Sequence, residues 1–261
     1  MRTITSVANP RFKALLKLAH SSRERRERGL SLLDGVHLVA AYLEHMGRPQ
    51  EIAVSEAGVE DPEIRALLKS MAALEPLVLG NALFRQLSTV QTPTGVLAAV
   101  STPRPRALPA AFDSCIMLED VQDPGNLGSI LRSAAAAGVR HVFLSRGSVH
   151  AWSPRVLRAG MGAHFMLDLH EQCDLVALAG GFQGRLIATS RRAGKSVFDC
   201  DLTGRIALLM GNEGAGLSDA LLRMAHQTVE IPMPGKVESL NVAAAAAICL
   251  FERVRQLAAA R

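Results

Sequence analysis

The sequence predicts an α/β protein in which a small N-terminal α/β domain precedes a mostly parallel sheet with helices on both faces. Short apolar segments bounded by turn residues recur along the chain, and helical segments separate them. Strands that alternate with helices are typical of parallel sheets. A stretch rich in Pro and Arg, STPRPRALP at 101–109, divides the chain. We therefore predict an N-terminal domain over 1–100, a linker over 101–112 and a second domain over 113–261.

The apolar segments of the two predicted domains differ in number. Before the linker, IAVS, LVLG and GVLAAV are expected strands, and HLVAAYLEHM is an expected helix. After it, CIMLEDV, HVFLS, RLIATS, RIALLMG and TVEIPM resemble buried parallel strands, with helices over 126–137, 218–225 and 240–257. Ligands of such sheets bind beyond the carboxyl ends of the strands. The loops after Val121, Met210 and Met233 are therefore the places to expect a site.

Composition limits the class of protein. The chain has 261 residues, which is long for one domain, and its 49% hydrophobic residues can form a sizeable core. It contains no apolar run of membrane-spanning length and begins without an apolar signal-peptide core, so we expect a cytoplasmic protein that does not insert into a membrane. Its four cysteines lack a CxxC pair and its eight histidines lack an HExxH motif. Reduced thiols and no metal are therefore expected.

Positive charge is concentrated at the start of the chain. The net charge is +5, and residues 1–30 contain eight Lys or Arg against two Glu. Such a stretch favours binding to phosphates, although RERRER at 23–28 also alternates charge in a way that suits a solvated helix pairing its own side chains. A second candidate for RNA contact lies in SPRVLRAGMGAHF. The alternative is that this segment is only a solvated helix followed by a turn. The predicted RNA contacts are Arg11, Lys13, Arg23, Arg25, Arg26 and Arg155.

The loop after Val121 introduces the first candidate site residues. It reads DPGNLGSILRSAAAAG, and Asn126 is a plausible N-cap for the helix that follows. Arg132 lies about two turns into that helix, which is otherwise small and apolar. A buried or half-buried arginine needs an anionic or carbonyl partner. The side chains of Asn126 and Arg132 can therefore converge on a site at the helix start.

The other two loops add glycines and polar residues. LLMGNEGAGLS brings a strand into a glycine-rich loop, where the backbone can approach a ligand closely. Its spacing differs from G-x-G-x-x-G and Glu213 would repel a pyrophosphate, so a cationic or neutral ligand fits better. In VEIPMPGKVESLNV, Ser239 is predicted to open a long helix as its cap. Asn241 in the first turn makes a purely structural role less satisfactory.

Three segments together resemble a known family. N-x-G-x-x-x-R at 126–132, M-G-N-E-G-x-G at 210–216 and I-P-M-x-G…S-L-N-V at 231–242 are similar to the ordered motifs of the SpoU (TrmH-like) RNA methyltransferases. The resemblance covers about residues 113–257. More loosely, LLDGVHLVAAYLE and GVLAAV resemble the start and end of the family's small, L30e-like substrate-binding domain. The resemblance to this family implies a SPOUT-type fold with a C-terminal trefoil knot. It also implies a homodimer whose cofactor and catalytic residues meet near the interface.

The resemblance also implies a reaction. Members transfer a methyl group from S-adenosylmethionine to a ribose 2′-hydroxyl, and a separate N-terminal domain favours ribosomal (23S-type) RNA over transfer RNA. The implied role of Arg132 has two versions. In one it is deprotonated and takes the hydroxyl proton; in the other it stays charged, grips a phosphate and stabilises the developing alkoxide while Glu213 or water accepts the proton.

The remaining site residues follow the same resemblance. Those implied to shape the catalytic pocket are Asn126, Glu213, Ser239 and Asn241. Those whose backbone is implied to hold the cofactor are Thr189, Gly211, Ile231, Met233 and Leu240.

Two other classes of protein are alternatives to an RNA methyltransferase. A noncatalytic RNA-binding protein of the same fold would have lost the arginine or the glycine loop, and this sequence has both. A Rossmann oxidoreductase requires a glycine fingerprint after the first strand, where this chain has DPGNLG. Gly194-Lys195-Ser196 suggests a phosphate-binding loop, but Thr189 stands where that motif needs glycine.

Overall fold

The computed structural model describes residues 3–72, 74–88, 93–104, 113–191 and 193–260, so most of the predicted linker, 105–112, lies outside the described residues. The chain folds into two compact units. The first unit comprises Met1–Pro103 and Trp152–Phe165, and the second comprises Arg104–Ala151 and Met166–Arg261. The segment Trp152–Phe165 thus groups with the first unit, although the sequence predicts it inside the second domain.

The first unit has a four-stranded sheet in the order β1-β4-β2-β3. The strands are β1 (Leu30–Asp34), β2 (Glu51–Ser55), β3 (Leu77–Leu79) and β4 (Val96–Ser101). Strand β4 is antiparallel to β1 and β2, whereas β2 and β3 are parallel. The helices are α1 (Pro10–His20), α2 (Ser22–Arg28), α3 (Val36–His45), α4 (Glu56–Val59), α5 (Pro62–Ser70), α6 (Asn81–Leu87) and α8 (Pro154–Gly160).

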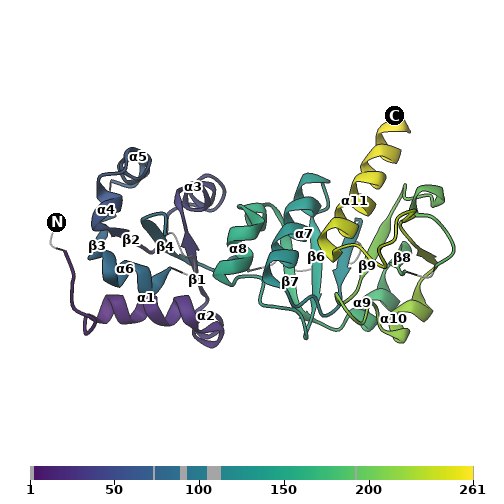
Figure 1. Ribbon diagram of the computed structural model, residues 1–261, viewed down its shortest axis with the longest axis horizontal. Coiled ribbons are helices and arrows are strands. Elements are labelled where there is room, and N and C mark those ends of the chain that lie inside the picture. Colours follow the sequence, from purple (N-terminus) through teal and green to yellow (C-terminus); the bar gives the residue numbers. More distant parts are fainter. Residues whose placement is uncertain (1–2, 73, 89–92, 105–112, 192, 261) are drawn as a thin grey trace. The chain divides into compact units, whose positions relative to one another are not determined.

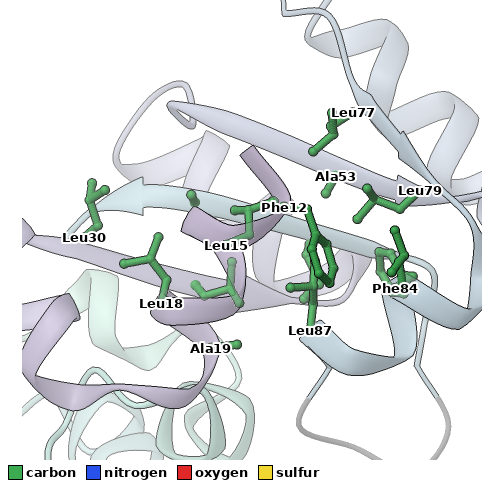
Figure 2. Packing of buried hydrophobic residues seen from close by; sticks show 14 residues of the cluster. Phe12, Leu15, Leu18, Ala19, Leu30, Ala53, Leu77, Leu79, Phe84 and Leu87 are labelled. Atoms are coloured by element: carbon green, nitrogen blue, oxygen red, sulfur yellow. The ribbon is translucent and has the colours of Figure 1, made fainter. Parts of the chain in front are cut away.

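Helix α1 covers one face of this sheet. The Asn9 side chain caps it by accepting hydrogen bonds from the backbone of Arg11 and Phe12, and a proline occupies the first helical position. Phe12, Leu15 and Leu18 recur at helical spacing, and all three are buried. Figure 2 shows them pointing into a cluster with side chains of the sheet and of α6. The charged residues of α1 are left on its outer face.

Arg25 has a structural role in α2. Its side chain is only 5% exposed, and its Nη1 donates to the carbonyls of Leu18 (2.6 Å) and Ala19 (3.2 Å). These carbonyls belong to the last turn of α1, which has no partners for them within the helix. The guanidinium therefore completes the end of α1. This placement corrects the prediction for Arg25, because a buried arginine that is already hydrogen-bonded is not available to RNA.

The second unit has a six-stranded sheet in the order β10-β8-β9-β5-β6-β7, and every pair of neighbours is parallel (Figure 1). The strands are β5 (Cys115–Leu118), β6 (His141–Ser145), β7 (Asp168–Cys173), β8 (Arg185–Thr189), β9 (Ile206–Met210) and β10 (Gln227–Val229). The chain runs outward from β5 through β6 to β7, and then returns to the other side of β5. The direction of winding therefore switches between β5 and β9, where ligands of such folds bind.

Helices cover both faces of this sheet, as predicted. They are α7 (Pro124–Ala136), α9 (Leu175–Gly181), α10 (Asp219–Met224) and α11 (Val242–Ala259). Helices α7 and α11 pack together, as do α9 and α10, and Figure 1 shows the two pairs on opposite faces. Met117 and Leu209 belong to the core cluster on the side of α9 and α10.

Two helix starts differ from the prediction. Helix α7 begins at Pro124, and its N-cap is Asp123, whose carboxylate accepts from the backbone N–H of Asn126 at 2.7 Å. Helix α11 begins at Val242 with Asn241 as its cap, so Ser239 does not open it. In α7 the reason is Pro124, because proline is favoured at the first helical position and places the cap one residue before it. The corrections leave the side chains of Asn126 and Ser239 available for other contacts.

Two structural features are not found among the described residues. No helix there is both long enough and apolar enough to span a bilayer. The same residues contain no group of three or more His, Cys, Asp or Glu side chains arranged to hold a metal ion.

Candidate active site

A cavity of about 740 Å³ opens in the second unit where β8, β9 and β10 end. Its volume lies within the range of roughly 300–1,000 Å³ that is common for small-molecule sites. The residues predicted to hold a cofactor all line it: Thr189, Gly211, Ile231, Met233 and Leu240. The loops after Met210 and Met233 therefore meet at one cavity.

The glycine loop after β9 forms one wall and is held by its own backbone. Asn212 and Gly216 exchange two backbone hydrogen bonds of 3.0 and 2.9 Å. A Cβ at Gly211 would overlap the backbone of Gly216 and Leu217, so this position needs glycine for space. Gly216 has φ of 75°, a conformation that glycine adopts easily. The loop is thus a compact turn that lines the cavity.

Asn212 ties this loop to the loop that precedes α7. Its Oδ1 accepts from the backbone of Gly214 (2.9 Å) and Ala215 (3.0 Å), and its Nδ2 donates to the carbonyl of Asp120 (2.8 Å). Asn212 is not among the residues predicted from the sequence. An asparagine that precedes Glu-Gly in a glycine-rich loop often accepts bonds from the backbone ahead of it, and this was the available signal.

Three side chains from the three motifs form a hydrogen-bonded chain beside the cavity. The Glu213 carboxylate accepts from Asn126 Nδ2 (3.1 Å) and from the backbone N–H groups of Gln122 (3.3 Å) and Asp123 (3.1 Å). Asn241 Nδ2 then donates to Asn126 Oδ1 at 2.7 Å. Asn126 is 87 residues from Glu213 and 115 from Asn241 along the chain. The fold therefore brings these three predicted residues together and fixes the orientation of the Asn126 amide.

These bonds set the charge of Glu213. Partial burial on its own would raise the pKa of this carboxyl group, but hydrogen bonds from Asn126, Asp123 and Gln122 lower the pKa below its ordinary value. Glu213 is therefore a carboxylate at neutral pH and a weak proton acceptor. This favours a role in orienting Asn126 over a role as the base.

Ser239 and Arg132 are not part of the hydrogen-bonded series Glu213–Asn126–Asn241. Ser239 lines the cavity on an exposed segment before α11. Arg132 is exposed on α7, whereas the sequence predicts a buried or half-buried arginine with a partner; that prediction is wrong for the single chain. The reason is the helix geometry, because α7 turns Leu131 and Ala134 inward and leaves Arg132 on its outer side.

Charged residues that were not predicted from the sequence also line the cavity. Glu230 accepts hydrogen bonds of 3.0 Å from the backbone of Ala193 and Gly194, so the amides of the apparent phosphate-binding loop already hold a carboxylate. Arg191 donates to the Gly214 carbonyl at 3.5 Å. Three glutamates contribute to the lining, Glu213, Glu230 and Glu238, against Arg191 as the one described cation. The balance of charge suits a cationic ligand.

The remaining predicted RNA contacts all lie in the first unit. Lys13, Arg26 and Arg155 are exposed. Arg11 pairs with Glu51 at 2.6 Å, and Arg23 pairs with Glu27 at 2.6 Å, one helical turn away. For Arg23 the structure matches the alternative of a solvated helix that pairs its own charges.

Comparison with known proteins identifies both parts of the chain. The model of the SpoU rRNA methylase family matches residues 113–251, and the model of the MRM3-like substrate binding domain matches residues 9–98. A Synechocystis protein named as an uncharacterized tRNA/rRNA methyltransferase is 36% identical, covering 97% of this chain and 94% of that protein. The 23S rRNA (guanosine(2553)-2′-O)-methyltransferase RlmP of Bacillus subtilis is 31% identical, covering 96% and 98%.

Solved structures agree with these relatives. A crystal structure of an RNA 2′-O ribose methyltransferase superposes with a TM-score of 0.84 at 31% identity, covering 98% of this chain and all of that one. The SpoU methyltransferase AviRb of Streptomyces viridochromogenes, in complex with AdoMet, gives a TM-score of 0.81 at 28% identity, covering 96% of this chain and all of that one. The predicted α/β fold class is confirmed. On the family match and on the relatives, the chain belongs to the SpoU rRNA methylase family.

Proposed function

We propose that this protein transfers a methyl group from S-adenosylmethionine to a ribose 2′-hydroxyl of ribosomal RNA, with 23S-type RNA as the substrate class. The observation that carries the proposal is the hydrogen-bonded series Glu213–Asn126–Asn241, which lies beside a cavity lined by the predicted cofactor residues. The family and the named reaction of the Bacillus subtilis relative support the same chemistry. Transfer RNA is the second candidate, because the Synechocystis relative's name includes it.

The cavity fits S-adenosylmethionine. Near neutral pH this cofactor carries a sulfonium, an ammonium and a carboxylate, a net charge of about +1. The three lining glutamates favour that charge, and the residues at the carboxyl ends of β8 and β9 line the cavity with backbone groups that can recognise a base. When bound, the cofactor supplies an electrophilic methyl group. Thr189, Gly211, Ile231, Met233 and Leu240 are the residues we propose to hold it.

The chain's own residues then position the ribose. Transfer of the methyl group requires a nearly linear approach of the oxygen, and such positioning is worth up to about 7–11 kcal/mol. Asn126 and Asn241 present amides in a fixed orientation because Glu213 anchors Asn126. We propose that these two amides, together with Ser239, hold the ribose and its phosphate at the cavity mouth.

Arg132 is proposed to act as a charged group. Arginine side chains carry a positive charge in proteins, and Arg132 is exposed. We therefore favour the version in which Arg132 grips the phosphate and stabilises the developing alkoxide. The hydroxyl proton then passes to water, since Glu213 is a weak acceptor.

We also propose a homodimer that works in the cytoplasm. Arg132 lies on the outer side of α7, and Phe251 of the neighbouring helix α11 is 48% exposed although it is a large apolar residue. A second copy against these helices would cover Phe251 and enclose Arg132. Sedimentation equilibrium that gives the mass of one chain at the concentration used for methylation would contradict the dimer. The trefoil knot stays a prediction.

Fractionated RNA tests the proposed substrate class. Total RNA from a strain that lacks the gene is incubated with the protein and S-adenosylmethionine labelled in its methyl group. We expect the label in ribosomal RNA. Label in transfer RNA alone would replace the substrate class, and label in neither fraction would support the noncatalytic RNA-binding alternative.

A further inference from the structure

Asp120, two residues after the end of β5, has an unusual backbone conformation. Its φ is 52°, in the left-handed region that glycine adopts easily and most other residues avoid. Aspartate and asparagine enter this region more readily than other side chains, because their short polar groups bond locally. Residues in such conformations persist where the surrounding structure holds them, and they are concentrated at functional sites. The contacts that hold Asp120 are therefore informative.

The end of β6 and the turn after it hold Asp120 by backbone and side chain. Ser145 Oγ accepts from the backbone N–H of Asp120 at 2.8 Å and donates to the Asp120 carboxylate at 2.5 Å. A Cβ at Gly147 would overlap that carboxylate, so glycine leaves the space that the side chain occupies. The backbone N–H of Val149 donates to the Val121 carbonyl at 2.9 Å. The segment after β6 thus fixes the turn after β5.

The carbonyl of Asp120 contacts the glycine loop. It accepts from Asn212 Nδ2 at 2.8 Å, while Asn212 Oδ1 accepts from the backbone of Gly214 and Ala215. Strands β5 and β9 are neighbours in the sheet, which brings the turns that follow them together. Because φ rotates the carbonyl of its own residue, an ordinary φ at Asp120 would turn this carbonyl away from Asn212. The Ser145 hydroxyl is therefore connected to the glycine loop through Asp120 and Asn212.

We propose that Asp120 is a positioning residue, which Ser145 holds in its left-handed conformation so that its carbonyl fixes the glycine loop at the cofactor cavity. The proposal rests on the proposed function, since it assigns Asp120 to the support of the cofactor wall. Gly211 and Glu213 of the loop line the described cavity, whereas Asp120 does not. Its effect on the cofactor consequently passes through Asn212.

The side chain of Asp120 contributes more than tolerance of the left-handed region. Glycine would adopt the same φ at no steric cost, but it would leave the backbone freer and would lack the carboxylate that Ser145 binds. Asparagine keeps an oxygen that can accept from Ser145 and also tolerates this φ. Alanine has neither property. The account therefore ranks substitutions at this position by two properties, the acceptor oxygen and the tolerated φ.

Two measurements on the full chain test the proposal: hydrogen exchange by mass spectrometry over the peptide that contains 211–217, and calorimetry with S-adenosylhomocysteine. Ser145→Ala is expected to speed exchange in this peptide and to weaken the affinity, each roughly tenfold, because the Asp120 backbone and carboxylate lose their shared partner. Asp120→Ala should do the same. Asp120→Asn should behave as the wild type in both measurements.

A double-mutant cycle tests whether Ser145 acts through Asn212. Asn212→Ala removes the amide that joins the two turns and should weaken binding of S-adenosylhomocysteine at least as much as Ser145→Ala. Adding Ser145→Ala to Asn212→Ala should weaken it only about twofold more, because residues in one network are not additive. A double variant whose loss is the product of the two single losses would contradict the path through Asp120.

Ser114→Ala is the matched control. Ser114 directly precedes β5, and its hydroxyl also joins two segments, since it accepts from the Ile206 N–H at 3.0 Å and donates to the Gly204 carbonyl at 3.2 Å. That variant should keep wild-type exchange over 211–217 and wild-type affinity. Unchanged exchange in both Ser145→Ala and Asp120→Ala would overturn the proposal, as would equal changes in Ser114→Ala. Faster exchange in these two variants of a protein whose wild type binds no S-adenosylhomocysteine would refute the proposed function and support the positioning of the loop by Asp120.

Discussion

Replacing Arg132 with alanine is expected to lower kcat for methyl transfer by about 10²- to 10⁴-fold, the range seen when a group that stabilises transition-state charge or moves a proton is removed. Arg132 does not line the described cofactor cavity. Calorimetry should therefore give the same affinity for S-adenosylhomocysteine as in the wild type. The loss should appear as a fall in kcat measured with saturating RNA and cofactor.

The control for this variant is Arg205→Ala. Arg205 is an exposed arginine at the amino end of β9, at the opposite edge of the sheet from the site, where its Nη1 donates to the Gln183 carbonyl. This variant should keep near wild-type kcat. If Arg132→Ala also keeps near wild-type methylation, Arg132 has no role in the reaction and its assignment fails.

Gly211→Ala is expected to abolish binding of S-adenosylhomocysteine. The added Cβ would overlap the backbone of Gly216 and Leu217, so the turn held by Asn212 and Gly216 must open. Overpacking of this kind destabilises a fold by about 1–3 kcal/mol. The damage also moves Glu213 away from Asn126, so methylation should be lost together with cofactor binding.

Gly181→Ala separates the local effect from a general effect of replacing glycine. Gly181 ends α9, and nothing lies within 4 Å of the Cβ that alanine would add there. That variant should bind S-adenosylhomocysteine as tightly as the wild type, in calorimetry that includes NAD and ATP as ligands expected not to bind. Full cofactor affinity in Gly211→Ala would show that the glycine loop does not form the cofactor wall.

The parallel sheet was predictable because buried strands of such sheets are apolar on both faces. Four of the five strand segments that the sequence identifies in the second domain, such as HVFLS and RIALLMG, hold β5, β6, β8 and β9, and TVEIPM contains the end of β10. Strand β7 was not predicted. It is an edge strand with the sequence DLHEQC, in which polar and half-buried residues replace the apolar run. Its position depends on pairing with β6, which local composition does not encode.

The sequence predicted the site residues within each contiguous motif, but not the contacts between motifs. Each motif marked its own residues, but the bonds from Asn126 to Glu213 and Asn241 join positions that are distant in sequence. The exposure of Arg132 depends on which side of α7 meets the sheet. The burial of Arg25 depends on the carbonyl groups that end α1, since an alternating run of charges gives no sign that one member turns inward.

The most direct test of the central claim is the chemical position of the transferred methyl group. Ribosomal RNA methylated with the labelled cofactor is digested to nucleosides and separated by chromatography, and a second sample is treated with alkali. We predict that the label elutes with a 2′-O-methylated nucleoside and that the adjoining phosphodiester resists alkali, because its 2′-hydroxyl is blocked. Label on a base, or on a nucleotide whose phosphodiester alkali still cleaves, would contradict 2′-O-methyl transfer by this protein.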